Sequence, residues 1–364
     1  MSKENAAWLN RNVLVGMADQ RGNAWHYRAD LQTPIITASG KSYMGNHYPG
    51  AIPVADVEDR LFAWEAVSRR VAVEIPATVE TMTHVDDEGN PLRWAVQDDR
   101  QAIATDDDHT VMGMFKAGYQ AHQYSEWLVG NVATMLDDDL QISSAGLLSN
   151  RAVAWVEVSV PESITTPEGI TFRPNLLATT SFDGTVATTY KRTVTATVCD
   201  NTLAMALSEK GQTWKAKHSR YSSHKITEAR DALGIVYATA DAFAAEVATL
   251  CQTPVTDKQF SLILDDLIPV KDKDGEPLSK IAVTKGEAKR ERIAGMYRND
   301  KRVGDWQGTA FGVYQAFNTW LHHEMPTRGK TNRAERNMLG VIKGDIDKFD
   351  ALTLASIGKV LSNA

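Results

Sequence analysis

The sequence predicts an α+β fold, in which an antiparallel β-sheet with packed helices is followed by a mainly helical C-terminal region. Two patterns predict this order. Runs rich in Val and Thr alternate with tight-turn residues in the first half of the chain, whereas apolar residues recur at helical spacing after position 226. With 364 residues, of which 43% are hydrophobic, the chain is long enough to bury a large core and to form more than one domain.

Residues 1–56 are predicted to form an irregular N-terminal arm. They contain many Gly, Asn and Pro residues and little periodicity, and such a segment can dock on a neighbouring subunit. Asp56 is a suitable N-cap for a short helix that continues to about position 65. Leu61, Phe62 and Trp64 are expected on the buried side of this helix.

Residues 57–225 are predicted to form an α+β core with an antiparallel sheet. Its first part, over about 69–115, is expected to be a meander with acidic turns. A helix follows over 124–136, where apolar residues recur at helical spacing. The aspartates at 137–139 should end it, because negative charges at a helix C-terminus oppose the macrodipole.

Two long hairpins are predicted next, over 140–160 and 175–198. The first turns at Ser149-Asn150 and the second at Asp183-Gly184. Asp-Gly between β-branched runs is a strong hairpin signal, because glycine tolerates the positive φ that a tight turn requires. The middle of the chain is therefore expected to be a sheet of about four strands.

The stretch CDNTLAMAL, residues 199–207, is predicted to turn the last strand into a helix. Asn201 or Thr202 can cap that helix. Cys199, at the junction, is expected to be a small buried side chain with a structural role rather than a nucleophile. Basic residues interleaved with two aromatic residues follow over 214–225, and they are candidates for contact with a ligand.

Residues 226–364 are predicted to be a helical C-terminal region. A long alanine-rich helix ends before Pro254, a second helix begins near position 256, and a polar linker falls at about 269–283. Further helices are expected over 284–299, 309–324, 331–343 and 346–362. The linker is the clearest internal boundary in the chain.

Charge is distributed unevenly along the chain. The net charge of −7 argues against indiscriminate nucleic-acid binding, and residues 86–108 contain eight carboxylates. By contrast, residues 191–230 and 285–302 are rich in Lys and Arg. No run approaches the roughly 18 apolar residues of a membrane span and no signal peptide is recognisable, so we expect a cytoplasmic protein that contacts no membrane.

No catalytic residue, metal or cofactor is predicted. Two cysteines, Cys199 and Cys251, are too few for a cysteine zinc site. The consecutive His-His-Glu at 322–324 points in three directions on a helix, so these side chains cannot bind one ion together. The GKT at 329–331 resembles the end of a phosphate-binding loop, but position 324 is Glu where that motif needs Gly.

One acidic turn leaves an alternative open. Asp106, Asp107 and Asp108 beside His109 suit a hard cation such as Mg²⁺. An acidic β-turn predicts the same residues without a metal, so no metal is assigned. A metal-dependent nuclease is the weaker alternative.

Four segments together resemble a known family. They are SFDGT at 181–185, VCDNTL at 198–203, KHS at 217–219 and GTAFGVYQAFNTWLHH at 308–323. In order and spacing they resemble the signature of an uncharacterised phage/plasmid-like protein family of bacteriophages, prophages and plasmids, over residues 110–325. Phe182 stands where this family usually has histidine, and Gln315 and Thr319 depart from its pattern in the late helix.

The order of sheet and helix is similar, at the level of the fold, to the RecT/Erf/Sak class of phage single-strand annealing proteins. This resemblance implies a non-enzymatic protein that binds and anneals single-stranded DNA in recombination or replication, as a large homo-oligomer in a ring or filament. A groove of this kind needs cations for the DNA backbone, and aromatic faces or apolar ledges for the bases. The candidate DNA-binding residues are Lys191, Arg192, Trp214, Lys215, Lys217, Arg220, Tyr221 and Lys225.

A second class of function also fits the acidic sequence. A phage protein that acts on host proteins, as an anti-restriction or host-defence module without DNA affinity, can use an acidic surface to compete with DNA for a basic site. Host or phage replication proteins are candidate partners in the first class. A host partner in pull-down experiments, together with no DNA affinity, distinguishes the second class from the first.

Overall fold

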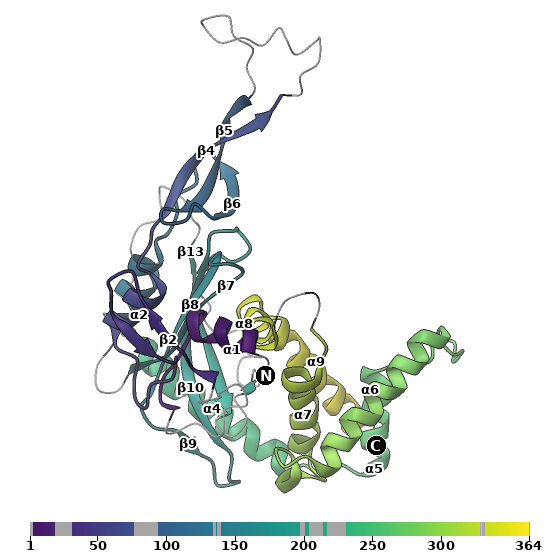
Figure 1. Ribbon diagram of the computed structural model, residues 1–364. Helices are drawn as coiled ribbons and strands as arrows, with labels where there is room; N and C mark the ends of the chain where they lie inside the picture. Colours follow the sequence, from purple (N-terminus) through teal and green to yellow (C-terminus); the bar gives the residue numbers. More distant parts are fainter. Residues whose placement is uncertain are drawn as a thin grey trace, which may run out of the picture.

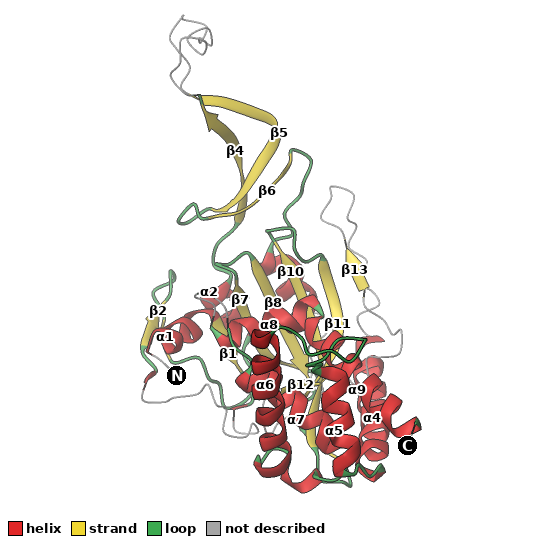
Figure 2. Cartoon of the chain, turned by 90° about the vertical axis from the view of Figure 1, so that its right-hand side faces the viewer, coloured by secondary structure: helices red, strands yellow, loops and turns green. Residues whose placement is uncertain are grey.

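A computed structural model of the chain shows a body built around one large antiparallel sheet, from which a second, three-stranded sheet projects (Figure 1). The described residues are 3–18, 31–75, 94–133, 136, 140–196, 201–203, 214–216, 231–327, 329 and 332–363. Most of the helices come from the C-terminal part of the chain and pack beside the main sheet (Figure 2). The predicted α+β class, with a mainly helical C-terminal region, is confirmed.

The main sheet is built from the two predicted hairpins. Its strands lie in the order β1–β7–β8–β10–β11–β12, each antiparallel to its neighbour, while β9 pairs with β10 and β13 with β11. Their bounds are Val13–Val15 (β1), Gln141–Leu148 (β7), Val153–Ser159 (β8), Ile164–Thr165 (β9), Thr171–Ser181 (β10), Thr188–Ala196 (β11), Asn201–Leu203 (β12) and Trp214–Ala216 (β13). The predicted turns at Ser149-Asn150 and Asp183-Gly184 lie between the strands of the two hairpins.

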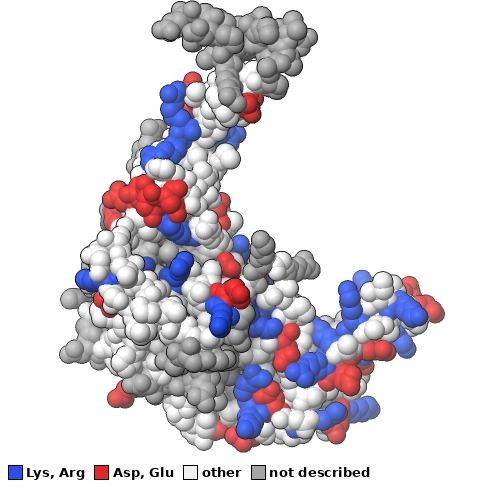
Figure 3. Space-filling view, in the orientation of Figure 1, with Lys and Arg blue, Asp and Glu red and all other residues white. Residues whose placement is uncertain are grey.

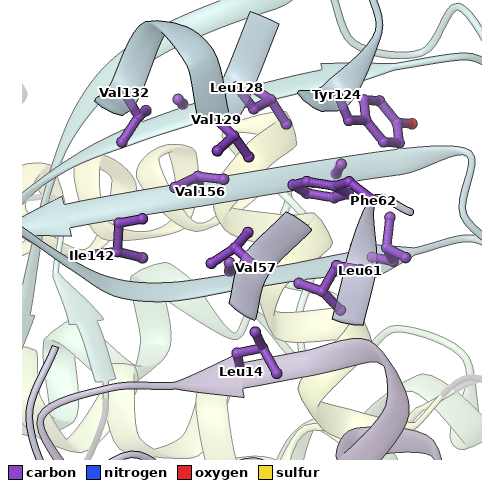
Figure 4. Close-up of a cluster of buried hydrophobic side chains, with 14 of the residues drawn as sticks. Leu14, Val57, Leu61, Phe62, Tyr124, Leu128, Val129, Val132, Ile142 and Val156 are labelled. Atoms are coloured by element: carbon purple, nitrogen blue, oxygen red, sulfur yellow. The ribbon is translucent and has the colours of Figure 1, made fainter. Parts of the chain in front are cut away.

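Hydrophobic cores lie on both faces of the main sheet. One face is covered by α2 (Val54–Leu61), the π-helical turn η4 (Ser125–Gly130) and α3 (Asn131–Ala133). Figure 4 shows apolar side chains of these helices directed towards Ile142 and Val156 of the sheet. The other face packs against α1 (Lys3–Asn12), α8 (Arg333–Lys343) and the start of α9 (Asp345–Ser362). Because strand residues alternate between faces, Leu176 of β10 joins the first core and Leu177 the second.

The remaining C-terminal helices form a third core. They are α4 (Asp231–Gln252), α5 (Asp257–Leu267), α6 (Lys280–Asn299), the 3₁₀ turn η6 (Gly304–Trp306) and α7 (Ala310–Thr319), which continues into the π-helical turn η7 (Trp320–Glu324). Phe243 of α4 packs on Phe172 of β10, with ring centroids 4.5 Å apart, so this region shares a core with the sheet. The helices predicted within 226–364 are confirmed as far as the described residues reach, although α6 begins inside the predicted linker. Among the described helices, none has the length and apolar character needed to cross a membrane.

Local sequence explains where several helices begin. Thr256 and Gln259 form a reciprocal capping box at the start of α5. Thr309 precedes α7, and its hydroxyl accepts a hydrogen bond from the Gly312 N–H at 3.1 Å. Gly344 adopts φ +78° between α8 and α9, a conformation that only glycine adopts without steric cost.

The second sheet, called the arm below, consists of β4 (Ala66–Glu74), β5 (Trp94–Thr105) and β6 (Val111–Lys116) in that order. It corresponds to the predicted meander, and Figure 1 shows it extending away from the main sheet. At its base, Ile103 and Met112 join the core on the α2 face. Farther out, Val73, Trp94 and Met114 are 50–68% exposed, because within the described part of the chain no second layer covers them.

The described part of residues 1–56 is more regular than the irregular segment that the sequence predicts there. Lys3–Asn12 form α1, and Val13–Val15 join the main sheet beside β7. A small hairpin follows, made of β2 (Pro34–Ile36) and β3 (Ser42–Met44). Ala6 and Leu9 of α1 are buried, which supplies the packing that a ten-residue helix needs.

Asn201 and Thr202 do not cap a helix, which corrects the prediction for this motif. They lie in β12, where Asn201 pairs with Ala196 and Thr202 with Thr195 of β11. Threonine suits a strand, and the free edge of β11 offers it backbone partners. Tertiary pairing therefore outweighs the local capping pattern, while Cys199 lies outside the described residues.

Candidate functional site

Lys191 and Arg192, the predicted cations of β11, point to opposite faces of the main sheet. Adjacent strand residues alternate between faces, so these two side chains cannot line one groove. Lys191 is 8% exposed, and its Nζ donates hydrogen bonds to the Val341 carbonyl and to Asp347 Oδ2, both at 2.7 Å. The ammonium group therefore joins the sheet to the corner between α8 and α9, and we leave it out of any surface for DNA.

Replacing Lys191 by methionine tests this structural role. Methionine keeps much of the volume but removes both hydrogen bonds from a charged donor, so the free energy of unfolding is expected to fall by about 2 kcal/mol. The Asp347 side chain is 36% exposed and can be hydrated, which limits the loss. Urea denaturation measures it. Unchanged stability with weaker DNA binding would instead assign Lys191 to the ligand surface.

The other predicted DNA-binding residues are described only in part. Arg192 is half-buried on the face of β11 opposite to Lys191. Trp214 and Lys215 belong to β13, whose backbone pairs with Tyr190 and Thr189 of β11. Outside the described residues lie Lys217, Arg220, Tyr221 and Lys225. The predicted residues that can be placed are thus arranged along β11, on more than one face of the sheet.

Two short strands pair with the same edge of β11. β12 pairs with Val194–Ala196, and β13 pairs with Thr188–Tyr190. Residues 191–193 of β11 lie between these two stretches, whereas residues 204–213 connect the two short strands in sequence. The end of the VCDNTL motif, residues 201–203, therefore builds part of this sheet edge.

The SFDGT segment also has a structural role. Asp183 Oδ1 accepts hydrogen bonds from the backbone N–H and the hydroxyl of Thr185, and Gly184 has φ +75°, as a tight turn requires. Phe182 is fully buried, and its ring stacks on Tyr124 with centroids 4.2 Å apart. Position 182 is thus part of the core in this chain.

The start of the late GTAFGVYQAFNTWLHH segment is fixed by close packing. Gly308 has φ +85°, and Thr309 is the N-cap of α7. A Cβ atom at Gly312 would overlap the carbonyl oxygen of Trp306. The glycines and the threonine of this motif are therefore explained by the entry of the chain into α7.

A polar network holds the other end of α7. Tyr314 Oη and Asn318 Nδ2 donate hydrogen bonds to the carboxylate of Asp350 in α9, at 2.9 and 3.2 Å. Arg336 of α8 donates to the Leu321 carbonyl in η7 at 2.7 Å, and burial lowers the pKa of Arg336 to about 10. These contacts join α7, α8 and α9 through buried polar groups rather than through a surface site.

The acidic turn at 106–109 forms ion pairs with Arg151 of the same chain. Arg151 Nη1 donates to the Asp107 carboxylate at 2.8 and 3.0 Å, and Nη2 donates to Asp108 Oδ2 at 2.7 Å. Partial burial would raise the pKa of Asp107, but hydrogen bonds from Arg151 and the Asp108 N–H lower it. A hydrogen bond from the Thr105 hydroxyl is the largest of the effects that lower the pKa of Asp108. Both groups are therefore carboxylates at neutral pH; among the described residues, no group of three or more His, Cys, Asp or Glu can hold a metal ion.

One face of the arm carries cations that no motif indicates. Arg69, Ala102 and Met114 lie directly opposite one another on the three strands, and Arg100 with Lys116 forms the next cross-strand pair on the same side. We call these five residues the cationic face of the arm. All but Ala102 are exposed, Met114 to 68%. Figure 3 shows Lys and Arg side chains along the arm.

The Arg100–Lys116 pair is unfavourable in the free protein. Like charges directly opposite one another destabilise an antiparallel pair. Asp99 Oδ2 lies 3.4 Å from Arg100 Nε, but its side chain is 75% exposed, so this ion pair contributes little. Among the described residues, no ion pair joins Lys116 to a carboxylate. Native proteins break such local rules mainly at functional or strained sites, so this pair makes the arm a candidate site.

In the second basic segment, at 285–302, some of the cations are paired within the chain. Its ion pairs join Arg290 to Asp265, Arg292 to Glu324 and Arg302 to Asp300. The Nζ of Lys289 lies 4.0 Å from the ring centroid of Trp320, and burial lowers its pKa. Lys285, Arg298 and Lys301 are exposed, so this segment offers available cations as well as the arm.

Comparison with known proteins places the chain in a family. A family model described as "Domain of unknown function (DUF932)" matches residues 111–339. This range begins at β6 of the arm, includes both hairpins of the main sheet and α4–α7, and ends within α8. The comparisons with curated proteins and with solved structures found no match. Because the matched range covers more than half of the chain, the protein belongs to the DUF932 family.

Proposed function

We propose that this protein is a phage single-stranded DNA-binding and annealing protein, which acts in recombination or replication as a homo-oligomer in the host cytoplasm. The cationic face of the arm is the observation that supports this function best. It provides three exposed cations, Arg69, Arg100 and Lys116, around an exposed methionine. Ala102, between them, is buried.

The geometry suits a single strand. Directly opposed residues such as Arg100 and Lys116 have Cβ atoms about 4.5–5.5 Å apart, so both reach the same stretch of DNA backbone. Met114 offers an apolar surface to unpaired bases beside those cations. Single-strand binders combine backbone cations with surfaces for the bases that are most often aromatic, and such contacts discriminate little between bases. Binding is therefore expected to depend on salt more than on sequence.

Fluorescence anisotropy with a labelled oligo(dT) tests the proposal. The wild-type protein is expected to bind, with an affinity that falls steeply as salt rises. In the variant Arg69→Gln/Arg100→Gln/Lys116→Gln, the slope of log K against log salt should be smaller by about 2, because each phosphate contact contributes about 0.7 on a single strand. A wild-type protein that does not bind the oligonucleotide at low salt would rule the function out.

A matched variant controls for net charge. Lys285→Gln/Arg298→Gln/Lys301→Gln removes the same charge from exposed positions on and beside α6. This variant should keep the wild-type slope if the arm binds the DNA. Equal losses in both variants would show that binding follows overall charge and would exclude the arm as the specific site.

Light scattering after size-exclusion chromatography tests the oligomer, with and without the same oligonucleotide. A ring or filament, together with faster pairing of complementary strands, supports annealing. A monomer that binds DNA but does not accelerate pairing would reduce the proposal to DNA binding alone.

A protein-interaction module without DNA affinity is the second candidate. Trp94 and Val96 share one face of β5 and are 50% and 41% exposed, and exposed apolar groups of this kind mark interaction sites. If this candidate is right, host proteins are retained by the wild-type chain and lost with Trp94→Ala/Val96→Ser. The wild-type chain would then also fail to bind oligo(dT).

A further inference from the structure

The turn between β7 and β8 has an unusual backbone. Ser149, Asn150 and Arg151 have φ values of +50°, +55° and +72°. Three consecutive residues other than glycine thus occupy the left-handed region, which L-residues rarely adopt. Such a conformation persists only where surrounding contacts determine it, and it often accompanies a functional role.

Contacts with the arm account for one side of this turn. The Arg151 guanidinium binds the carboxylates of Asp107 and Asp108, which lie in the turn between β5 and β6. It also lies 5.4 Å from the ring centroid of Trp64, just before β4 begins. The side chain is 25% exposed, so these ion pairs are partly shielded from solvent.

Contacts with α8 and with Tyr124 hold the other side of this turn. The Ser149 N–H donates a hydrogen bond to Glu335 Oε1 of α8 at 3.0 Å. Tyr124, just before η4, donates its hydroxyl to the Arg151 carbonyl at 2.9 Å. One strained turn therefore contacts the arm, α8 and the residue that leads into η4.

We propose that Arg151 is the positioning residue of the arm, whose ion pairs set the direction of the arm relative to the main sheet. The turn can adopt its strained conformation because the ion pairs on one side and Glu335 on the other both hold it. Loss of the ion pairs lets the turn relax and frees the arm to change direction. The turn also links that direction to α8, through the Ser149 N–H.

Other contacts keep the base of the arm folded when Arg151 is absent. The Gln123 side chain pairs with both the N–H and the carbonyl of Ala66, at 3.0 and 2.8 Å. Phe115 stacks on Tyr119 with centroids 3.8 Å apart. Neither contact involves the β7–β8 turn. We therefore expect a folded protein with an arm of less defined direction.

Distances between two spin labels measure this direction. Labels at Val73→Cys on the arm and Leu352→Cys on α9 use positions that are 51% and 64% exposed, in a Cys199→Ser/Cys251→Ser background. The protein with Arg151 is expected to give a narrow distribution. Arg151→Ala is expected to give a distribution about twice as wide, because the ion pairs that set the direction of the arm are then lost while its base stays packed. High salt should broaden the distribution of the protein with Arg151.

Further variants keep the experiment decisive. Asp107→Asn/Asp108→Asn should reproduce the broad distribution, and it replaces Arg151→Ala if that variant does not fold. Arg151→Lys keeps the charge without the paired geometry of guanidinium, so an intermediate width is expected. Lys359→Ala breaks an ion pair with Asp266 far along α9 and should leave the distribution narrow. A narrow distribution in folded Arg151→Ala would overturn the proposal.

Arg151 can position the arm whether or not the arm binds DNA. The label distances are measured without any ligand, so they report on the arm even if the chain ignores oligonucleotides. A broad distribution in Arg151→Ala with no DNA binding would support the positioning role and reject the proposed function. The reverse combination would reject the positioning role alone.

Discussion

Replacement of Phe182 by alanine is expected to lower the free energy of unfolding by about 3–5 kcal/mol, the usual range for removing a buried aromatic ring. Phe182 is fully buried, stacks on Tyr124 and meets the edge of Trp64 with centroids 6.2 Å apart. The loss of this ring leaves a cavity that the sheet, held by backbone pairing, cannot close. Urea denaturation monitored by far-UV circular dichroism measures the effect.

Two further variants test whether burial of the aromatic ring is the cause. Trp94→Ala removes a larger ring from a half-exposed position on the arm and should change stability little. Phe182→His introduces the residue usual in the phage/plasmid-like signature, but here it buries an imidazole in an apolar pocket and should also destabilise the fold. A stable Phe182→His variant would show that the pocket supplies a hydrogen-bond partner and would contradict a purely apolar role for position 182.

Gly312→Ala is expected to lower the free energy of unfolding by about 3 kcal/mol through overpacking. Its Cβ atom would overlap the carbonyl oxygen of Trp306. That carbonyl cannot move freely, because it accepts hydrogen bonds from the Thr309 hydroxyl at 2.7 Å and the Thr309 N–H at 3.1 Å. The Trp306 ring in turn packs edge-on against Phe311, with centroids 5.2 Å apart.

Gly295 provides the matched control for Gly312. It lies inside α6, and no atom approaches within 4 Å of a Cβ built at this position. Gly295→Ala should therefore stabilise the protein by about 1 kcal/mol, the difference in helix propensity between the two residues. Thermal or urea unfolding of both variants checks the pair. Equal effects of the same sign would show that crowding at Trp306 is not the cause.

The parts of the fold that local chemistry determines were predictable from sequence. The hairpin at Asp183-Gly184 follows from a glycine that tolerates positive φ, and the C-terminal helices follow from long runs with helical spacing. The sequence does not predict the helix α1, although Ala6 and Leu9 have suitable spacing, because the many Gly, Asn and Pro residues that follow it are typical of irregular structure.

The parts that depend on distant partners were not predictable in the same way. Asn201 and Thr202 form a strand because β11 offers them backbone partners, which no local pattern shows. Lys191 looked available because lysine is usually exposed, whereas here its ammonium group pairs with Asp347 from a helix more than 150 residues later. In both cases the residue's structural role is set by a partner that is distant in the sequence, so the residues around it do not reveal that role.

The cationic face of the arm can be recognised only when the pairing register of its three strands is known. Arg69, Arg100 and Lys116 are spread over three strands, and only the pairing places them on one side. The sequence shows no alternation signal for Arg69, which lies between Ser68 and Arg70 in β4. The other two follow acidic residues or an aromatic one, so their shared position depends on tertiary structure.

The alternation of β10 between two hydrophobic cores has a consequence for how this chain can evolve. Leu176 and Leu177 serve opposite cores, so one residue inserted between Thr171 and Ser181 would exchange the two faces for the rest of the strand. The exposed turn at 271–277, between α5 and α6, has no such constraint. Across homologues, β10 should therefore keep a constant length while that turn varies in length. Insertions and deletions are thus expected in the exposed turns and not in the strands between two cores.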